Sequence, residues 1–313
     1  MFSNFIVDGV KEAELIKGGY NAEYGGRLSA VLNVISREGN RKRFKGKTNL
    51  SLLSAQTTLE GPFYKGAWLL SGRRTYFDFI LPKVLPAGIA SLIPPYYFYD
   101  IQSHIFSDIT PRDRVSISFY NGIDDLVYDT FGLDAQWGNN TVSAHYRRVF
   151  SERLISNFLI ANSIFFTKFG LGGSSGLQSK NEINDITVSG NMTWFRSPEA
   201  TIKFGFQYKS LGFQYLNSFQ DSTQFAIKTQ PAEIAQYVKF KYTPNSIWII
   251  EPGLRLNYYD VYPDSLFPDL RLGVKYLLTD DRYINLSVGN YHQFICTFQD
   301  DFNPSILDQW IAV

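Results

Sequence analysis

The chain has 313 residues, of which 44% are hydrophobic and 16% aromatic, and its formal net charge is +1. A near-neutral chain has no long-range attraction for nucleic acid, and this apolar, aromatic-rich composition excludes intrinsic disorder. The single cysteine, Cys296, excludes an intrachain disulfide framework and any metal site built from several cysteines. With three histidines in the chain, we expect no metal site and no cofactor.

The N-terminal residues lack the basic start and apolar core of a signal peptide. We therefore expect the gene product to be longer than this chain if the protein lies outside the cytoplasm. No stretch is typical of a membrane helix, because the most apolar region, 77–99, contains Lys83 and four prolines. Any membrane role is expected to use strands.

The first 45 residues differ in character from the rest of the chain. They predict a short strand after Glu14, a glycine-rich turn, and a second strand over 28–36. Glycines at 18, 19, 25 and 26 permit backbone geometry that other residues resist. Taken alone, the pattern indicates only a small sheet with glycine turns.

From residue 46 onward, alternation of apolar and polar residues predicts strands. Between 185 and 194, for example, Ile186, Val188 and Trp194 oppose Asp185 and Ser189. Six segments show the pattern, and every charge in them falls on the polar face: 114–120, 185–194, 201–209, 248–258, 269–278 and 284–289. One exception to good strand composition is Pro252, because proline is poorly placed inside a central strand.

The connections alternate strictly in length, so all tight turns are expected at one end of the sheet and all long loops at the other. The tight turns are 110–113, 150–152, 196–199, 243–246 and 279–282. The longer loops are about 121–138, 167–181, 212–230 and 259–267. The predicted strands are long enough to cross a bilayer, and aromatic residues gather at both of their ends. This asymmetry is typical of a transmembrane β-barrel with short periplasmic turns and long extracellular loops.

We count about thirteen barrel strands: 46–54, 56–63, 66–78, 97–109, 113–121, 138–150, 152–165, 182–195, 200–212, 231–242, 246–259, 268–279 and 282–295. Single-chain bacterial barrels have an even number of strands, and an unclosed barrel exposes two sheet edges to lipid. The predicted fold class is therefore an all-β, partial transmembrane antiparallel barrel, and we interpret the chain as a fragment.

Three stretches also resemble one family. Ile16-Lys-Gly-Gly, Ala22-Glu-Tyr-Gly-Gly-Arg and the run from Val31 to Gly39 are similar to the end of the plug domain of TonB-dependent outer-membrane receptors. The segments 58–62 and 71–76 resemble the first barrel strands of the Bacteroidetes members, and 267–273 with 291–294 resembles a later hairpin. Compared with that family, this chain lacks most of the plug, the energy-coupling box and about nine C-terminal strands.

The resemblance implies two domains, a C-terminal part of a plug at 1–45 and an N-terminal part of an outer-membrane β-barrel at 46–313. It implies a receptor that takes up a scarce solute by energy-coupled gating, in the outer membrane of a Gram-negative bacterium. The implied partners are outer-membrane lipid, an inner-membrane energy-coupling complex that acts through the absent plug segment, a small solute and a surface lipoprotein. No nucleic acid and no enzymatic activity are expected.

Candidate residues fall into two groups. Arg73 and Arg74 are adjacent on an early strand and cannot both face lipid, so at least one is predicted to point into the lumen and pair with Glu23 or Glu38. Glu23, Arg27, Arg73 and Arg74 are therefore the candidates for the plug–barrel contact. The acidic and aromatic loop 123–137 is the candidate for solute or cation binding, through Asp124, Asp125, Tyr128, Asp129 and Trp137, although a plain solvated loop explains it as well.

Other readings of the same sequence remain open. A passive channel or an adhesin has the same strand pattern, but neither needs a plug segment at 14–39. A soluble propeller packs four strands into each repeat, whereas two are found here. The run Gly172-Gly-Ser-Ser-Gly176 matches the nucleophile elbow of hydrolases, yet no strand-to-helix turn and no positioned histidine accompany it.

Overall fold

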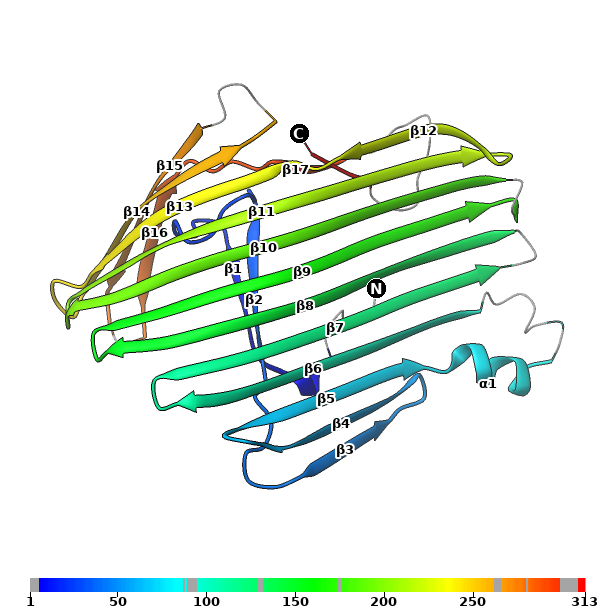
Figure 1. Ribbon diagram of the computed structural model, residues 1–313, viewed down its shortest axis with the longest axis horizontal. Helices are drawn as coiled ribbons and strands as arrows, with labels where there is room; N and C mark the ends of the chain where they lie inside the picture. The colour runs from blue at the N-terminus through cyan, green and yellow to red at the C-terminus, as the bar shows by residue number, and fades with distance from the viewer. Residues whose placement is uncertain are drawn as a thin grey trace.

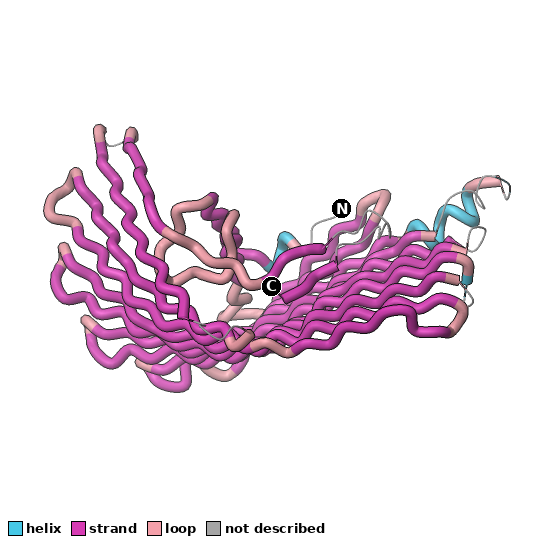
Figure 2. The backbone as a smooth tube through the Cα atoms, turned by 90° about the horizontal axis from the view of Figure 1, so that it is seen from above, coloured by secondary structure: helices cyan, strands magenta, loops and turns pink. Residues whose placement is uncertain are grey.

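The computed structural model describes residues 6–86, 88, 95–128, 132–173, 176–261, 266–279, 281–298 and 309–312. Most of them form one antiparallel sheet of 14 strands, which curves into the trough seen in Figures 1 and 2. Its first strands are β3 (Lys45–Leu50), β4 (Ser54–Phe63), β5 (Gly66–Thr75), β6 (Tyr96–Thr110), β7 (Asp113–Tyr128), β8 (Leu133–Ser151) and β9 (Leu154–Leu171). The remaining strands are β10 (Leu177–Ser197), β11 (Ala200–Phe219), β12 (Ser222–Thr229), β13 (Ala232–Tyr242), β14 (Trp248–Tyr259), β15 (Leu266–Leu277) and β16 (Tyr283–Gly289). The predicted all-β class is confirmed.

The two faces of the sheet have opposite chemistry. The apolar side chains of the alternating segments point outward and are exposed, including Phe204 and Phe206 at 43% and 42% and Leu286 at 68%. The inner face buries polar side chains, among them Arg255, Asn257 and Asp269, which are all fully buried. A protein that folds in water does the reverse, so the sheet has the polarity of a barrel in lipid.

The long loops expected between strands are mostly strand themselves. Strands β7 and β8 continue past the predicted ends and pair as far as Tyr128 and Leu133, and β9 and β10 pair as far as Leu171 and Leu177. The expected loop 212–230 contains β12, which pairs with the end of β11. Thirteen of the 14 strands were predicted, and β12 was missed because its sequence has no apolar alternation.

Two further departures have local causes. A short helix, α1 (Phe77–Val84), occupies the connection after β5, where only a broken apolar run was predicted. Pro252 does lie inside β14, opposite Leu272 of β15. The ladder between β14 and β13 runs only from Tyr259 to Gly253 and resumes at Ile250, so the missing amide of Pro252 falls where no bond to β13 is made.

The N-terminal residues form a separate hairpin in the hollow of the trough. Strands β1 (Val10–Lys17) and β2 (Ala30–Ser36) pair with each other antiparallel, after the short 3-10 helix η1 (Val7–Gly9). Figure 1 shows them running across the sheet strands, and Figure 2 shows the loop between them on the concave side. The predicted strand, glycine turn and strand are confirmed.

The last described segment also turns into the hollow. After β16, residues 290–294 lie on the inner face, and β17 (Ile295–Phe298) pairs with β18 (Gln309–Ala312). The ring of Phe294 stacks on Tyr259 of β14 with 4.6 Å between centroids. Ser174 and Ser175 of the hydrolase-like match lie outside the described residues. Among the residues that are described, no helix is both long enough and apolar enough to cross a bilayer.

Candidate functional site

The loop between β1 and β2, residues 18–29, touches the inner wall at β11, β13, β14 and β15. Its Tyr24-Gly-Gly-Arg27 turn depends on two glycines. Gly26 has a φ of +71°, which disfavours other residues, and a Cβ at Gly25 would overlap the guanidinium of Arg255. The glycines therefore let the backbone of this loop lie directly on a buried arginine. We call residues 18–29 the plug loop, after the plug domain that the sequence resemblance implies for residues 1–45.

The side chain of Arg271 on β15 binds backbone carbonyl groups of the plug loop. One of its nitrogens, Nη1, donates to the carbonyl of Asn21 at 2.9 Å and also to the carbonyls of Tyr20 and Tyr24. Its other end nitrogen, Nη2, donates to Asp269 at 2.7 Å. The guanidinium carbon Cζ lies over the ring of Tyr291, 4.3 Å from the ring centroid. One arginine thus holds three carbonyl groups of a loop about 250 residues away in sequence.

Arg255 of β14 lies at the centre of a second buried network. Its Nε donates to Asn257 at 2.7 Å, and its Nη2 donates to Gln207 at 2.9 Å and lies 3.5 Å from a carboxylate oxygen of Glu233. Its Nη1 reaches the carbonyl of Glu23 at 3.5 Å. Both members of the Arg255–Glu233 pair are at most 3% exposed. Buried charges need such complete partnering, because leaving water is costly for each ion.

Asp269 joins the two networks. It accepts from Asn257 at 3.1 Å, pairs with Arg271, and its other oxygen lies 2.6 Å from Nδ1 of His292. His292 therefore lies on the lumen side, next to a buried carboxylate.

Glu23 is the charged side chain that the plug loop directs at the wall. It forms ion pairs with Lys203 of β11 and with Lys239 of β13, the latter at 3.0 Å. A cavity of about 290 Å³ lies beside Glu23, between the plug loop and the side chains of Gln207 and Lys209. One carboxylate therefore bridges two strands and joins the loop to the wall.

We expect this contact to weaken as the pH falls. Burial alone raises the pKa of Glu23, but the ammonium groups of Lys239 and Lys203 outweigh burial and hold the pKa below its ordinary value of 4.5. A pKa that is lower in the folded state contributes stability above the unfolded value, and this is lost as the pH falls through the folded value. Hydrogen exchange at the Tyr24 amide, which donates to Asn21, measures the effect.

The protection factor of that amide, corrected for the intrinsic exchange rate, should fall on acidification below about pH 4.5 in the wild type. In Glu23→Gln it should be lower at neutral pH and show no such fall. An equal loss of protection in both proteins would show that another group titrates.

The other contact candidates lie elsewhere. Arg73 is on the inner face, as expected of one member of the pair, and its Nε donates to Asp100 of the neighbouring strand at 2.8 Å. Arg74 points the other way and pairs with Asp78 at 2.7 Å. Glu38 pairs with Arg114, so the predicted pairing of Arg73 with Glu23 or Glu38 is wrong. The reason is that Asp100 sits directly opposite Arg73 in the β5–β6 ladder.

Arg27 remains within the plug loop. Its guanidinium donates to the carbonyl of its neighbour Gly26 at 2.7 Å, and it lines the cavity beside Glu23. Its own carbonyl accepts a hydrogen bond from the hydroxyl of Tyr20, which belongs to the same loop. The arginine therefore shapes the loop.

The candidates of the 123–137 segment lie on strands β7 and β8. Asp124 accepts from the Tyr96 hydroxyl and lies opposite Trp137, whereas its neighbour Asp125 accepts from Gln136 at 2.8 Å on the other face. Adjacent strand residues point to opposite faces, so these two carboxylates cannot hold one cation together. Tyr128 ends β7, and Asp129 lies outside the described residues. Within the described part, no group of three acidic, histidine or cysteine side chains has metal-site geometry.

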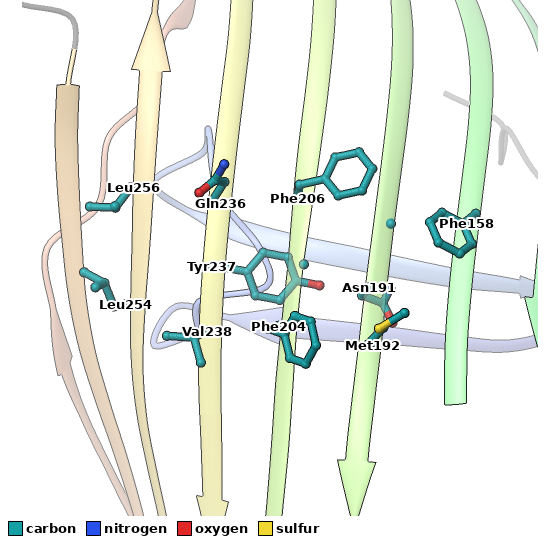
Figure 3. A pocket seen from close by; sticks show the side chains of 12 residues that line it. Phe158, Asn191, Met192, Phe204, Phe206, Gln236, Tyr237, Val238, Leu254 and Leu256 are labelled. Atoms are coloured by element: carbon teal, nitrogen blue, oxygen red, sulfur yellow. The ribbon is translucent and has the colours of Figure 1, made fainter. Parts of the chain in front are cut away.

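Another hollow lies on the opposite, outer face. It has a volume of about 530 Å³, and Figure 3 shows its side chains, among them Phe158, Phe204, Phe206 and Leu256. The rings of Phe158 and Phe206 close over Gly190, where a Cβ would lie within 2.8 Å of both. A mostly apolar hollow on an apolar outer face suits lipid chains.

Sequence reasoning missed most of the contact. The residues it did not single out are Lys203, Glu233, Lys239, Arg255, Asn257, Asp269, Arg271 and Tyr291. A signal was present, since the charges of 201–209, 248–258 and 269–278 all fall on one face of their strands. Charges in the middle of a membrane strand have to face the lumen, where they need partners.

Comparison with protein-family models and with curated proteins found no match. Solved structures do match. The siderophore receptor PirA from Pseudomonas aeruginosa has a TM-score of 0.67 at 14% identity over 94% of this chain and 50% of its own. FpvA from P. aeruginosa, bound to pyoverdines, has a TM-score of 0.68 at 13% sequence identity, over 88% of this chain and 46% of its own. The copper transporter OprC has a TM-score of 0.70 at 11% identity, over 95% of this chain and 52% of its own.

This chain thus spans about half the length of the proteins it matches. The chain has the fold of the TonB-dependent outer-membrane receptors, as the resemblance at residues 14–39 predicts.

Proposed function

We propose that this chain belongs to a gated outer-membrane receptor that takes up a scarce solute, with residues 1–45 as the end of its plug and residues 46–313 as the first part of its barrel. The outer membrane of a Gram-negative bacterium is the proposed location. The solute binds outside, and an inner-membrane energy-coupling complex displaces the plug. Recognition and gating are the whole mechanism, with no covalent chemistry. A surface lipoprotein is a further proposed partner.

The observation that carries this proposal is the buried contact between the plug loop and the wall. Arg255, Arg271 and Glu23 hold the loop through ion pairs and hydrogen bonds to backbone carbonyls. Such groups are satisfied only while the loop is seated, and polar partners can be exchanged for water when it moves. The contact therefore holds the loop while it is seated, and water in the lumen can replace these hydrogen bonds when the loop moves.

The solved structures that this chain resembles include a siderophore receptor and a copper transporter, which supports a receptor for a small solute. We propose a small solute for this chain and no particular one. The alternative, a passive channel or adhesin, has no use for a seated loop that crosses the lumen.

A disulfide between the plug loop and the wall tests gating. A Cβ at Gly253 of β14 would lie 2.8 Å from the Cβ of Ala22, close enough for Ala22→Cys with Gly253→Cys to bond after a small shift. The pair is made in the complete receptor with Cys296→Ser. In planar bilayers with potassium chloride, urea at a concentration that unseats the plug should open the wild type, while the oxidised pair stays closed until it is reduced.

The matched control joins two barrel strands instead. Thr58 and Ser71 of β4 and β5 have hydroxyl oxygens 2.9 Å apart, so Thr58→Cys with Ser71→Cys forms a lock that leaves the plug free. This variant should open like the wild type. Conductance without urea in all three proteins would instead establish a passive channel.

A further inference from the structure

An exposed ring of cations surrounds the tight-turn end of the sheet. Each of the described tight turns from β4 to β16 has a lysine or arginine in it or directly beside it, and all of these side chains are exposed: Lys65, Arg112, Arg153, Arg196, Lys241 and Arg282. One of the long connections, 121–138, contrasts with these turns, since it contains four aspartates and no lysine or arginine.

Aromatic side chains accompany these cations on the outer face. The ammonium of Lys65 lies 5.5 Å from the ring of Tyr64, and the guanidinium of Arg196 lies 5.9 Å from the ring of Trp194. The guanidinium of Arg148, just before the turn between β8 and β9, lies 5.2 Å from the ring of Phe150. An aromatic ring at the edge of the apolar zone with a cation beyond it is the arrangement that suits the boundary between acyl chains and headgroups.

The segment that joins the plug hairpin to β3 extends the ring. Phe44 is 63% exposed and its ring lies 6.2 Å from Trp68 of β5. The amides of Lys42 and Arg43 donate to the side chain of Asn40 at 2.8 and 3.1 Å, which fixes the turn that presents them. Among the described residues, neither side chain has a carboxylate partner within ion-pair distance.

The turns also contain the carboxylates of Asp113, Glu152, Glu199 and Asp281, but among the described residues none of these lies within ion-pair distance of a cation of the ring. Glu199 accepts from its near neighbour Ser197, and Asp281 accepts from Thr279, so both are held within their own turns. Asp113 lies 3.4 Å from Arg148 and accepts from Tyr146 at 2.7 Å. The cations at the turn tips remain free to meet an external anion.

We propose that this ring, with Lys42 and Arg43, binds the phosphate groups of anionic phospholipids in the periplasmic leaflet. The inference rests on the proposed placement in an outer membrane, where short turns face the periplasm. A lysine or arginine near a bilayer surface enriches anionic lipid about five-fold, and several of them in one ring act together. Lipid bound at Lys42 and Arg43 would also hold the linker between the plug hairpin and β3.

The test uses the folded chain in nanodiscs of phosphatidylcholine with a minor fraction of phosphatidylglycerol. Native mass spectrometry counts the lipids that stay bound. The neutral variant replaces all eight cations with glutamine, namely Lys42, Arg43, Lys65, Arg112, Arg153, Arg196, Lys241 and Arg282, and the matched control exchanges lysine and arginine at the same positions. Wild type and control should retain phosphatidylglycerol at least about five-fold above its share of the bilayer, and the neutral variant should retain it at that share.

A separate measurement reports insertion. Brominated acyl chains quench the tryptophans of any protein that crosses the bilayer, whatever the headgroup. A chain that is quenched by both lipids yet shows no enrichment of phosphatidylglycerol would overturn the inference alone. Enrichment that survives in the neutral variant would do the same. A chain that is not quenched at all would overturn the outer-membrane placement itself, and the lipid ring with it.

Discussion

Replacing Arg255 with methionine is expected to destabilise the chain by about 3–5 kcal/mol, the usual result of removing one member of a buried ion pair. Arg255 is fully buried, and its loss leaves Glu233, Asn257 and Gln207 without the donor they share. The carbonyl of Glu23 in the plug loop loses a donor as well. Urea unfolding in detergent micelles, followed by tryptophan fluorescence, measures the change.

A double substitution separates lost pairing from lost packing. Arg255→Met with Glu233→Leu removes both charges, so the stranded carboxylate disappears and most of the lost stability should return. The exposed Arg153→Met serves as the control, with an expected change within about 0.5 kcal/mol. A double variant as unstable as Arg255→Met would mean that the arginine acts through packing or through the plug loop, and not through Glu233.

An arginine at Val188 should cost about 2–4 kcal/mol in a lipid bilayer, whereas an arginine at the next residue, Ser189, should cost little. Val188 lies on the outer face of β10, paired with Ile160 and Tyr208 on the same side. Ser189 lies at the same depth on the inner face, opposite Gln207. The two substitutions add the same side chain to the same strand and differ only in the medium that surrounds it.

Folding into liposomes over a urea series gives both free energies. The expected order is wild type, Ser189→Arg and then Val188→Arg as the least stable. The reverse order would mean that the polar face is the packed one, and the transmembrane interpretation of the sheet would be wrong.

The strands and their polarity could be predicted because each depends on a local pattern. The alternation around Val188 and Ser189 sorts side chains onto two faces whatever the partner strands are. Gly26 likewise marked the plug loop, because its positive φ selects for glycine locally. Strand β12 and helix α1 escaped prediction, since β12 is specified by its pairing with β11 and α1 includes a proline.

By itself, the sequence determined the all-β class, 13 of the 14 strands of the sheet, the sorting of apolar and polar side chains onto two faces, and the presence of an N-terminal hairpin. Only the tertiary structure decided which charges meet. Glu23 pairs with Lys203 and Lys239, which are 180 and 216 residues away, and Arg271 grips backbone carbonyls that carry no sequence signature. The physical reason is that alternation specifies the face on which a charge lies, whereas its partner depends on how the sheet curves and where the loop is seated against it.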